Sequence, residues 1–310
     1  MLAQLASELR IAVNRAVRWR KVAIMGVGLL GGSLGRALRR QGLAGEVAGY
    51  VRREVTIREA VEAKAVDWAD CNLAKVVGGA DLVVLCTPVA QMALLVSDLV
   101  PSLALGALVT DVGSVKGAIV AAAEDPIGRA RARFVGSHPM AGSERTGVSA
   151  SREDLFAGAV CVVTPTPVSD PGAVAEVGEL WRSVGARVLT MSPERHDELV
   201  ARSSHLPHLV ASSLASYILA SGHPPEQAQL CASGFRDTTR VASGSPEMWR
   251  DIALANRESI LAALDGFGAV VAELRGAIED ADAAGLERIL SQAKERRDHW
   301  TGGGTRAAAE

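Results

Sequence analysis

Three glycines in the pattern Gly-x-Gly-x-x-Gly constrain the fold of this 310-residue chain more than any other feature. They begin at the end of an apolar, β-branched run at residues 21–27 and lead into a helical pattern. In such a unit the first glycine permits a tight turn, the second lets a pyrophosphate approach the backbone, and the third lets the helix pack on the strand. The helix N-terminus adds free N–H groups and a partial positive charge. The turn therefore predicts dinucleotide binding by Gly26, Gly28, Leu29, Leu30 and Gly31.

The first half of the chain alternates strand-like and helix-like segments, whereas the second half is helical. Strand-like runs occupy residues 21–27, 46–51, 81–86, 107–112, 159–164 and 187–189. Such alternation is typical of a parallel sheet covered on both faces. After Ser192-Pro193 the chain is rich in Ala, Leu, Glu and Arg with helical spacing. We predict an α/β then all-α chain: an N-terminal helical arm (1–20), a doubly wound Rossmann domain (21–190), a helical domain (191–300) and a flexible tail (301–310).

Composition excludes several classes of partner. The chain has 33 Lys and Arg against 35 Asp and Glu, a formal net charge of -2, which predicts neither nucleic-acid nor membrane binding. No apolar run is long enough for a transmembrane helix, and residues 1–20 lack the apolar core of a signal peptide. The four cysteines are widely spaced, which favours a reducing, cytoplasmic location.

The residues after the second strand indicate the cofactor. An NAD site usually has an acid at this strand end to bind the ribose 2′-hydroxyl. Here the strand ends at Tyr50-Val51, and Arg52 and Arg53 follow at once. Guanidinium groups are suited to a 2′-phosphate. We therefore favour NADP, while NAD stays open because Glu54 could serve its ribose.

Most of the six histidines lie in polar clusters at turns and helix ends. His138 is predicted in a turn after a strand, and His196, His205 and His208 begin the helical domain. A metal site is disfavoured because no His-Glu-x-x-His pattern occurs and Pro207 separates two of the histidines. Local capping or packing could explain any one histidine alone. Together they predict a substrate site in the cleft where such folds bind ligands.

At these residues the sequence resembles the prephenate/arogenate dehydrogenase family of tyrosine biosynthesis. The resemblance rests on the motifs at residues 26–33, 86–88, 111–117, 137–144, 155–156, 196–197, 204–208, 234–240 and 246–252. It implies a Rossmann domain followed by a helical domain that forms a homodimer. It also implies oxidative decarboxylation of a cyclohexadienol, prephenate or arogenate, with hydride transfer to a nicotinamide cofactor.

The resemblance also implies roles for individual residues. His138 would be the base on the substrate hydroxyl, with Ser114 orienting either His138 or the hydroxyl, and Arg240 would bind the ring carboxylate. Four further residues would contact the substrate: His208, His205, His196 and Glu144. Thr87 and Pro88, at a strand end, would lie beside the cofactor, as would Ser114. Trp249 is expected to pack rather than react.

Two other functions remain as alternatives. A β-hydroxyacid or imine reductase of similar layout usually needs a lysine in the helical domain, where Lys294 is the only lysine and lies in a charged stretch near the C-terminus. A dinucleotide-sensing regulator would need no set such as His138, Ser114 and Arg240.

Apolar positions around most faces of the helices in the second half also predict a homodimer.

Overall fold

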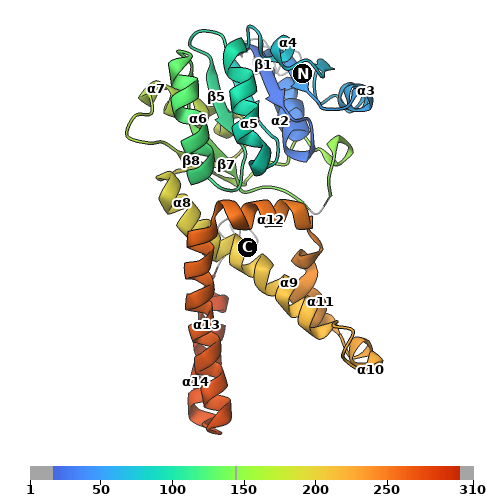
Figure 1. Ribbon diagram of the computed structural model, residues 1–310, viewed down its shortest axis with the longest axis vertical. Helices are drawn as coiled ribbons and strands as arrows, with labels where there is room; N and C mark the ends of the chain where they lie inside the picture. Colours follow the sequence, from blue (N-terminus) through green and yellow to red (C-terminus); the bar gives the residue numbers. More distant parts are fainter. Residues whose placement is uncertain (1–16, 144, 301–310) are drawn as a thin grey trace, which may run out of the picture. The chain divides into compact units, whose positions relative to one another are not determined.

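The computed structural model describes residues 17–143 and 145–300 (Figure 1). Most of the predicted N-terminal arm, the tail at 301–310 and Glu144 lie outside these residues. The described chain divides into two compact units, one ending at Asn256 and the other beginning at Arg257. The last strand ends at Thr190, and the first helices after it belong to the same compact unit as the sheet.

A six-stranded parallel sheet forms the centre of the first unit, in the order β3-β2-β1-β4-β5-β6. Its strands are β1 Trp19–Met25, β2 Ala44–Tyr50, β3 Trp68–Asp70, β4 Leu82–Leu85, β5 Leu108–Asp111 and β6 Arg133–Phe134. The order reverses between β1 and β4, and ligands of open α/β sheets bind outside the carboxyl ends of strands at such a point.

The helices of the sheet region follow the strands in turn. They are α2 Leu29–Arg40, α3 Glu54–Glu62, α4 Leu73–Val77, α5 Val89–Leu99, η1 Val100–Ser102, α6 Gly117–Arg129, η2 Val148–Ala150 and α7 Pro171–Ser183. Helices α5 and α6 pack side by side (Figure 1).

The sheet has an apolar core on each face because its side chains alternate. Val22 and Ile24 of β1 point into one cluster, and Ala23 and Met25 point into the other; all four are fully buried. This two-sided burial is why the strands read as continuous apolar runs.

A three-stranded sheet completes this region, with β7 antiparallel to β8 and β8 parallel to β9. Its strands are β7 Gly136–Pro139, β8 Val160–Thr164 and β9 Arg187–Thr190. The prediction of a turn at His138 was wrong, since His138 lies in β7 and pairs with Val162 of β8. β7 contains no β-branched residue, so its extended form depends on pairing with β8.

The predicted helical arm was wrong at all four of the residues that the structure describes, 17–20, because none of them is helical. Trp19 and Arg20 belong to β1, where Trp19 pairs with Ala44 and is 4% exposed. Arg20 donates from its backbone N and its guanidinium to the carboxylate of Asp81, both at 2.7 Å. These contacts to distant residues extend the strand in a segment whose local pattern favours a helix.

Every element after β9 is helical, as predicted. In the first unit these are α8 Pro193–Val200, η3 Ala201–His205, α9 Leu206–Ile218, α10 Pro225–Gln229, α11 Ser233–Thr239, η4 Arg240–Ser243 and α12 Pro246–Ala255. The segment η3 is a π-helical turn just before Pro207. Proline has no N–H and crowds the carbonyl four residues earlier, so it widens the preceding turn.

The second unit consists of α13 Arg257–Glu279 and α14 Ala283–His299, which pack against each other. Asp282 caps α14 by accepting from the Gly285 N–H at 3.0 Å. No helix among the residues that the structure describes is long and apolar enough to cross a membrane.

Candidate functional site

The glycine turn follows β1 and has the geometry that the sequence predicts. Gly26 has φ of +104°, which favours glycine, and its N–H donates to the Tyr50 carbonyl at 3.1 Å. A Cβ on Gly31 would lie 2.1 Å from the Gly26 carbonyl oxygen, so only glycine lets α2 start this close to β1. These two positions hold the turn against the helix.

Gly28 is different, because a Cβ there would meet no atom within 4 Å. It stands before Leu29 and Leu30, the first residues of α2, and no acidic residue lies in the first helical turn. The backbone N–H groups therefore face open space at the positive end of a helix, which fits a pyrophosphate.

Thr87 lies at the carboxyl end of β4, next to Gly26. Its Oγ1 atom is buried and has no hydrogen-bond partner among the described residues. A buried hydroxyl without a partner is unusual and is satisfied when a ligand supplies one. Pro88 follows as the N-cap of α5. Together with the open backbone at Gly28, this orphaned hydroxyl shows that the carboxyl edge of the sheet fits a dinucleotide.

Arg52 and Arg53 are exposed directly after β2, and Arg53 is the N-cap of α3. Neither forms an ion pair or a side-chain hydrogen bond among residues 17–143 and 145–300. Two guanidinium groups are therefore free at the strand end where ribose is usually recognised.

A buried chain of side chains begins at His138, which is 8% exposed. Its Nδ1 lies 2.8 Å from Nε2 of His196 in α8, and the two rings meet edge to face. Nδ1 of the fully buried His196 lies 2.7 Å from Oδ1 of Asp197. The strand half and the first helix after it thus meet in a His–His–Asp chain.

Asp197 is held by the start of α6. Its Oδ1 accepts from the Lys116 backbone N–H at 2.7 Å, and its Oδ2 accepts from the Gly117 N–H at 2.8 Å. A carboxylate at a helix N-terminus is stabilised in its charged form. The Asp197 carboxylate therefore accepts a hydrogen bond from the Nδ1–H group of His196. This leaves His196 Nε2 as an acceptor for His138.

A buried ion pair lies next to this His–His–Asp chain. The fully buried Lys116 contacts Asp111 through Nζ and donates to the Ser137 carbonyl at 2.7 Å. The other Asp111 oxygen accepts from the Ser137 N–H at 3.0 Å. The pair fixes the backbone on both sides of the site, since Ser137 precedes His138 and Lys116 precedes Gly117. Burial lowers the pKa of Lys116, while Asp111 acts in the opposite direction.

The electrostatics keep two imidazoles neutral. Burial first, then His196, Lys116 and His205, hold the pKa of His138 well below its usual value. Burial also lowers the pKa of His205 to about 4, against an opposing effect of Asp197. At neutral pH, His138 is therefore an uncharged base.

His205 and His208 flank this region at the start of α9. Asn256 joins His205 to the chain, because its Nδ2 lies 3.2 Å from His205 Nδ1 and donates to the Asp197 carbonyl at 2.9 Å. His208 stacks on Trp249 at 3.5 Å between ring centroids, and burial lowers its pKa. Trp249 packs, as predicted.

Of the remaining predicted residues, Ser114 reaches this network through its backbone, which interacts with His205, whereas Arg240 does not. Ser114 is half-buried in the loop between β5 and α6. Arg240 is exposed at the start of η4, which packs on α9 and α11, and it has no ion pair among the described residues. The described contacts bring His138, His196 and His205 into one network but do not include Arg240.

Sequence reasoning gave no role to Asp111, Lys116 or Asn256. A signal was present for the first two, because an acid and a lysine interrupt an otherwise apolar stretch at residues 107–120. Asn256 had no such signal. Within the described ranges no cluster of three His, Cys, Asp or Glu side chains is placed to hold a metal ion.

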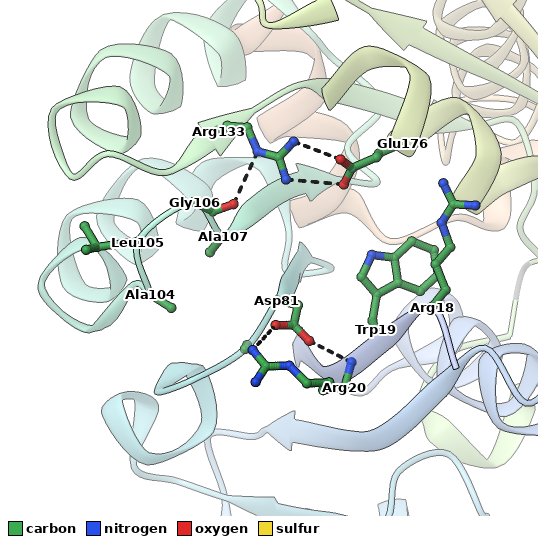
Figure 2. A pocket seen from close by; sticks show the side chains of 11 residues that line it. Arg18, Trp19, Arg20, Asp81, Ala104, Leu105, Gly106, Ala107, Arg133 and Glu176 are labelled. Carbon is green, nitrogen blue, oxygen red and sulfur yellow. Dashed lines mark hydrogen bonds and ion pairs between the residues drawn. The ribbon is translucent and has the colours of Figure 1, made fainter. Parts of the chain in front are cut away.

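A pocket of about 500 Å³ lies at the opposite, amino edge of the sheet (Figure 2). Arg20 pairs there with Asp81 at 2.7 Å, and Arg133 pairs with Glu176 at 2.9 Å. None of the residues that the sequence predicts for the site lines it.

The fold and the turn at β1 define a dinucleotide-binding protein of the Rossmann class. Residues 34–190 match the prephenate dehydrogenase nucleotide-binding domain, and residues 192–292 match the prephenate dehydrogenase dimerization domain. The chain therefore belongs to the prephenate dehydrogenase family.

Individual relatives agree with this assignment. Prephenate dehydrogenase of Bacillus subtilis is 36% identical over 282 residues, which cover 89% of this chain and 75% of that protein. The Aquifex aeolicus prephenate dehydrogenase structure with hydroxyphenyl propionate and NAD+ has a TM-score of 0.84 at 35% identity, and the match covers 90% of this chain and 97% of that one. Synechocystis arogenate dehydrogenase has a TM-score of 0.76 at 33% identity, with 90% and 99% covered.

Proposed function

We propose that the chain catalyses the oxidative decarboxylation of prephenate, with arogenate as an alternative substrate, and that His138 is the base. The observation that carries the proposal is the buried His138, which His196 holds at 2.8 Å and whose lowered pKa keeps it neutral. Family membership supports the reaction class.

The chemistry requires an electron-rich oxygen on the carbon that loses hydride. Nε2 of His138 accepts the proton of the C4 hydroxyl, the C4–H bond breaks, and the C4 oxygen becomes a carbonyl. The nicotinamide, when bound, accepts this hydride. Loss of CO2 from C1 then returns an electron pair to the ring, which becomes aromatic while the oxygen regains a proton. Ser114 orients the hydroxyl, and Arg240 binds the ring carboxylate through its planar fork.

We assign the substrate contacts to His205 and His208, with Glu144 as a further contact. His208 stacks on Trp249, which limits the motion of its ring. Both ring nitrogens of His196 have partners, His138 at Nε2 and Asp197 at Nδ1, so His196 acts through His138 rather than on the substrate.

NADP is the cofactor that Arg52 and Arg53 favour, because both guanidinium groups are free at the end of β2. Arg52→Asp should weaken NADP binding much more than NAD binding. Arg58→Asp is the matched control, since Arg58 lies in α3, the helix that follows Arg52 and Arg53, and pairs with Glu62. Equal losses for both cofactors in Arg52→Asp would contradict the assignment.

Self-association is supported by the match to a dimerization domain and by α13. Leu264, Phe267, Val271 and Ile278 recur at helical spacing, and each is at least 36% exposed. Such a stripe is suited to a second copy of the chain. We expect sedimentation at micromolar concentration to report a dimer, and Phe267→Glu to weaken it.

The cysteines, all free thiols, support a reducing and thus cytoplasmic location. The reductase alternative is disfavoured by Lys294, whose Nζ pairs with Asp298 on the exposed α14. A regulator would not need the buried His–His–Asp chain.

The proposed reaction is tested by measuring the increase in absorbance at 340 nm with each substrate and each cofactor. His138→Asn should lower kcat by about 10²- to 10⁴-fold, the usual contribution of a general base, while cofactor binding is retained. Wild-type protein without activity on either substrate would contradict the proposed function.

A further inference from the structure

The geometry points to a proton relay, which rests on the proposed function: when His138 takes the substrate proton, it passes its own Nδ1 proton to Nε2 of His196. His196 and Asp197 are then positioning residues that set the tautomer of His138 and receive its charge. Neither side chain needs to reach the substrate, because His138 and Asp197 occupy both ring nitrogens of His196 and two backbone N–H groups hold the Asp197 carboxylate.

The hydrogen bonds fix the direction of the relay. Asp197 accepts from two backbone N–H groups and so has no proton to give. His196 must therefore donate from Nδ1 to Asp197 and accept at Nε2. His138 then carries its proton on Nδ1, towards His196, and leaves Nε2 free for the substrate hydroxyl. The relay sets which nitrogen of His138 is the base.

Charge favours the transfer of the proton from His138 to His196. The titratable groups that act on His138 are His196 from α8, Lys116 before α6 and His205 from η3, and Cys161 of β8 lies against its backbone. His138 is buried near the Lys116 ammonium, so a positive charge on it is unfavourable. A charge on His196 lies next to the Asp197 carboxylate, 2.7 Å away. Protonated His196 is therefore the better place for the charge.

The atoms balance at each step. The substrate O–H bond breaks as the His138 Nε2–H bond forms, and the His138 Nδ1–H bond breaks as the His196 Nε2–H bond forms. No oxidant or further reactant enters. The reverse transfers return the proton to the product oxygen, so the enzyme ends each cycle in its starting state.

His196→Gln separates the relay from simple positioning. A glutamine carbonyl can accept from His138 Nδ1–H and keep the tautomer, but it cannot take the proton. We expect kcat to fall about 10²-fold, within the range for a lost proton-transfer group, with KM and nucleotide affinity unchanged. The acid limb of kcat/KM should move to higher pH, because a neighbour that lowers the pKa of His138 is gone.

The matched control is His223→Gln, the same change in the loop between α9 and α10, and it should retain wild-type kcat. A His196→Gln enzyme with wild-type kcat and acid limb would overturn the relay, even with His138→Asn inactive, and the proposed function would stand.

A measurement on wild-type protein needs no variant. If two protons move together, kcat in mixtures of H2O and D2O should depend on deuterium fraction along a curve, and the His196→Gln rate should follow a straight line. A straight line for wild type would overturn the relay. Absence of any turnover by wild type would overturn the proposed function instead.

Discussion

The two edges of the parallel sheet use similar charged pairs for different purposes. At the carboxyl edge, Lys116 and Asp111 are fully buried and hold the backbone beside His138. At the amino edge, Arg20 and Asp81 are 88% and 28% exposed around an open pocket (Figure 2). Burial makes a charge costly unless each of its bonds is satisfied, whereas water screens an exposed pair. The comparison indicates that the chain concentrates its costly polar interactions at the proposed catalytic site.

The sharpest test of this comparison is Lys116→Met. Removal of one partner leaves the Asp111 carboxylate buried without its cation, which costs about 3–5 kcal/mol in the free energy of unfolding. Denaturant titration would measure the loss. The double variant Lys116→Met, Asp111→Leu should recover part of it, and a single variant as stable as wild type would contradict the assigned importance of the pair.

The two edges should also respond to different ranges of pH. The pKa of His205 falls from 6.5 when unfolded to about 4 when folded, so the unfolded chain binds its proton first. The contribution of neutral His205 to the free energy of unfolding is complete above pH 6.5. It is lost as the pH falls towards 4, a decrease of about 3 kcal/mol. Arg20 lowers the pKa of Asp81, so that pair contributes at pH values above the usual pKa and is lost only at lower pH.

Unfolding curves between pH 8 and pH 3 check the sign. In His205→Asn the loss between pH 6.5 and pH 4 should be smaller than in wild type, and Arg20→Gln should leave it unchanged. An equal slope in His205→Asn and wild type would show that other groups control acid unfolding.

Trp249→Leu should have a smaller effect. The stacked His208 and Trp249 rings contribute about 0.5–1.5 kcal/mol beyond the area that they bury. We expect a modest loss of stability and a larger increase in KM, because His208 loses the surface that fixes its ring. Steady-state kinetics together with thermal unfolding would separate the two effects.

The smallest effect is expected at the amino edge. Arg20→Gln removes an exposed pair, and its influence on unfolding should decrease further as salt is raised. A large, salt-independent loss in Arg20→Gln would remove the contrast between the edges.

Local signals explain most of what the sequence predicted correctly. Gly26, Gly28 and Gly31 lie within one turn, so their geometric requirements are encoded in adjacent residues. The central strands were found because both of their faces are buried, which leaves long apolar runs. The short strands β3, β6 and β7 were missed because pairing with distant partners, rather than their own composition, makes them extended.

The sequence by itself determined the dinucleotide turn, the order of sheet and helices, and the residue types that we propose for proton transfer and carboxylate binding. Tertiary structure decided which of them meet. His138 and His196 are 58 positions apart, and Lys116 and Asp197 are 81 apart, so no local pattern pairs them. The tautomer of His138 and the burial of Lys116 follow from this packing, because hydrogen bonding and desolvation depend on which atoms surround a group rather than on which residues precede it.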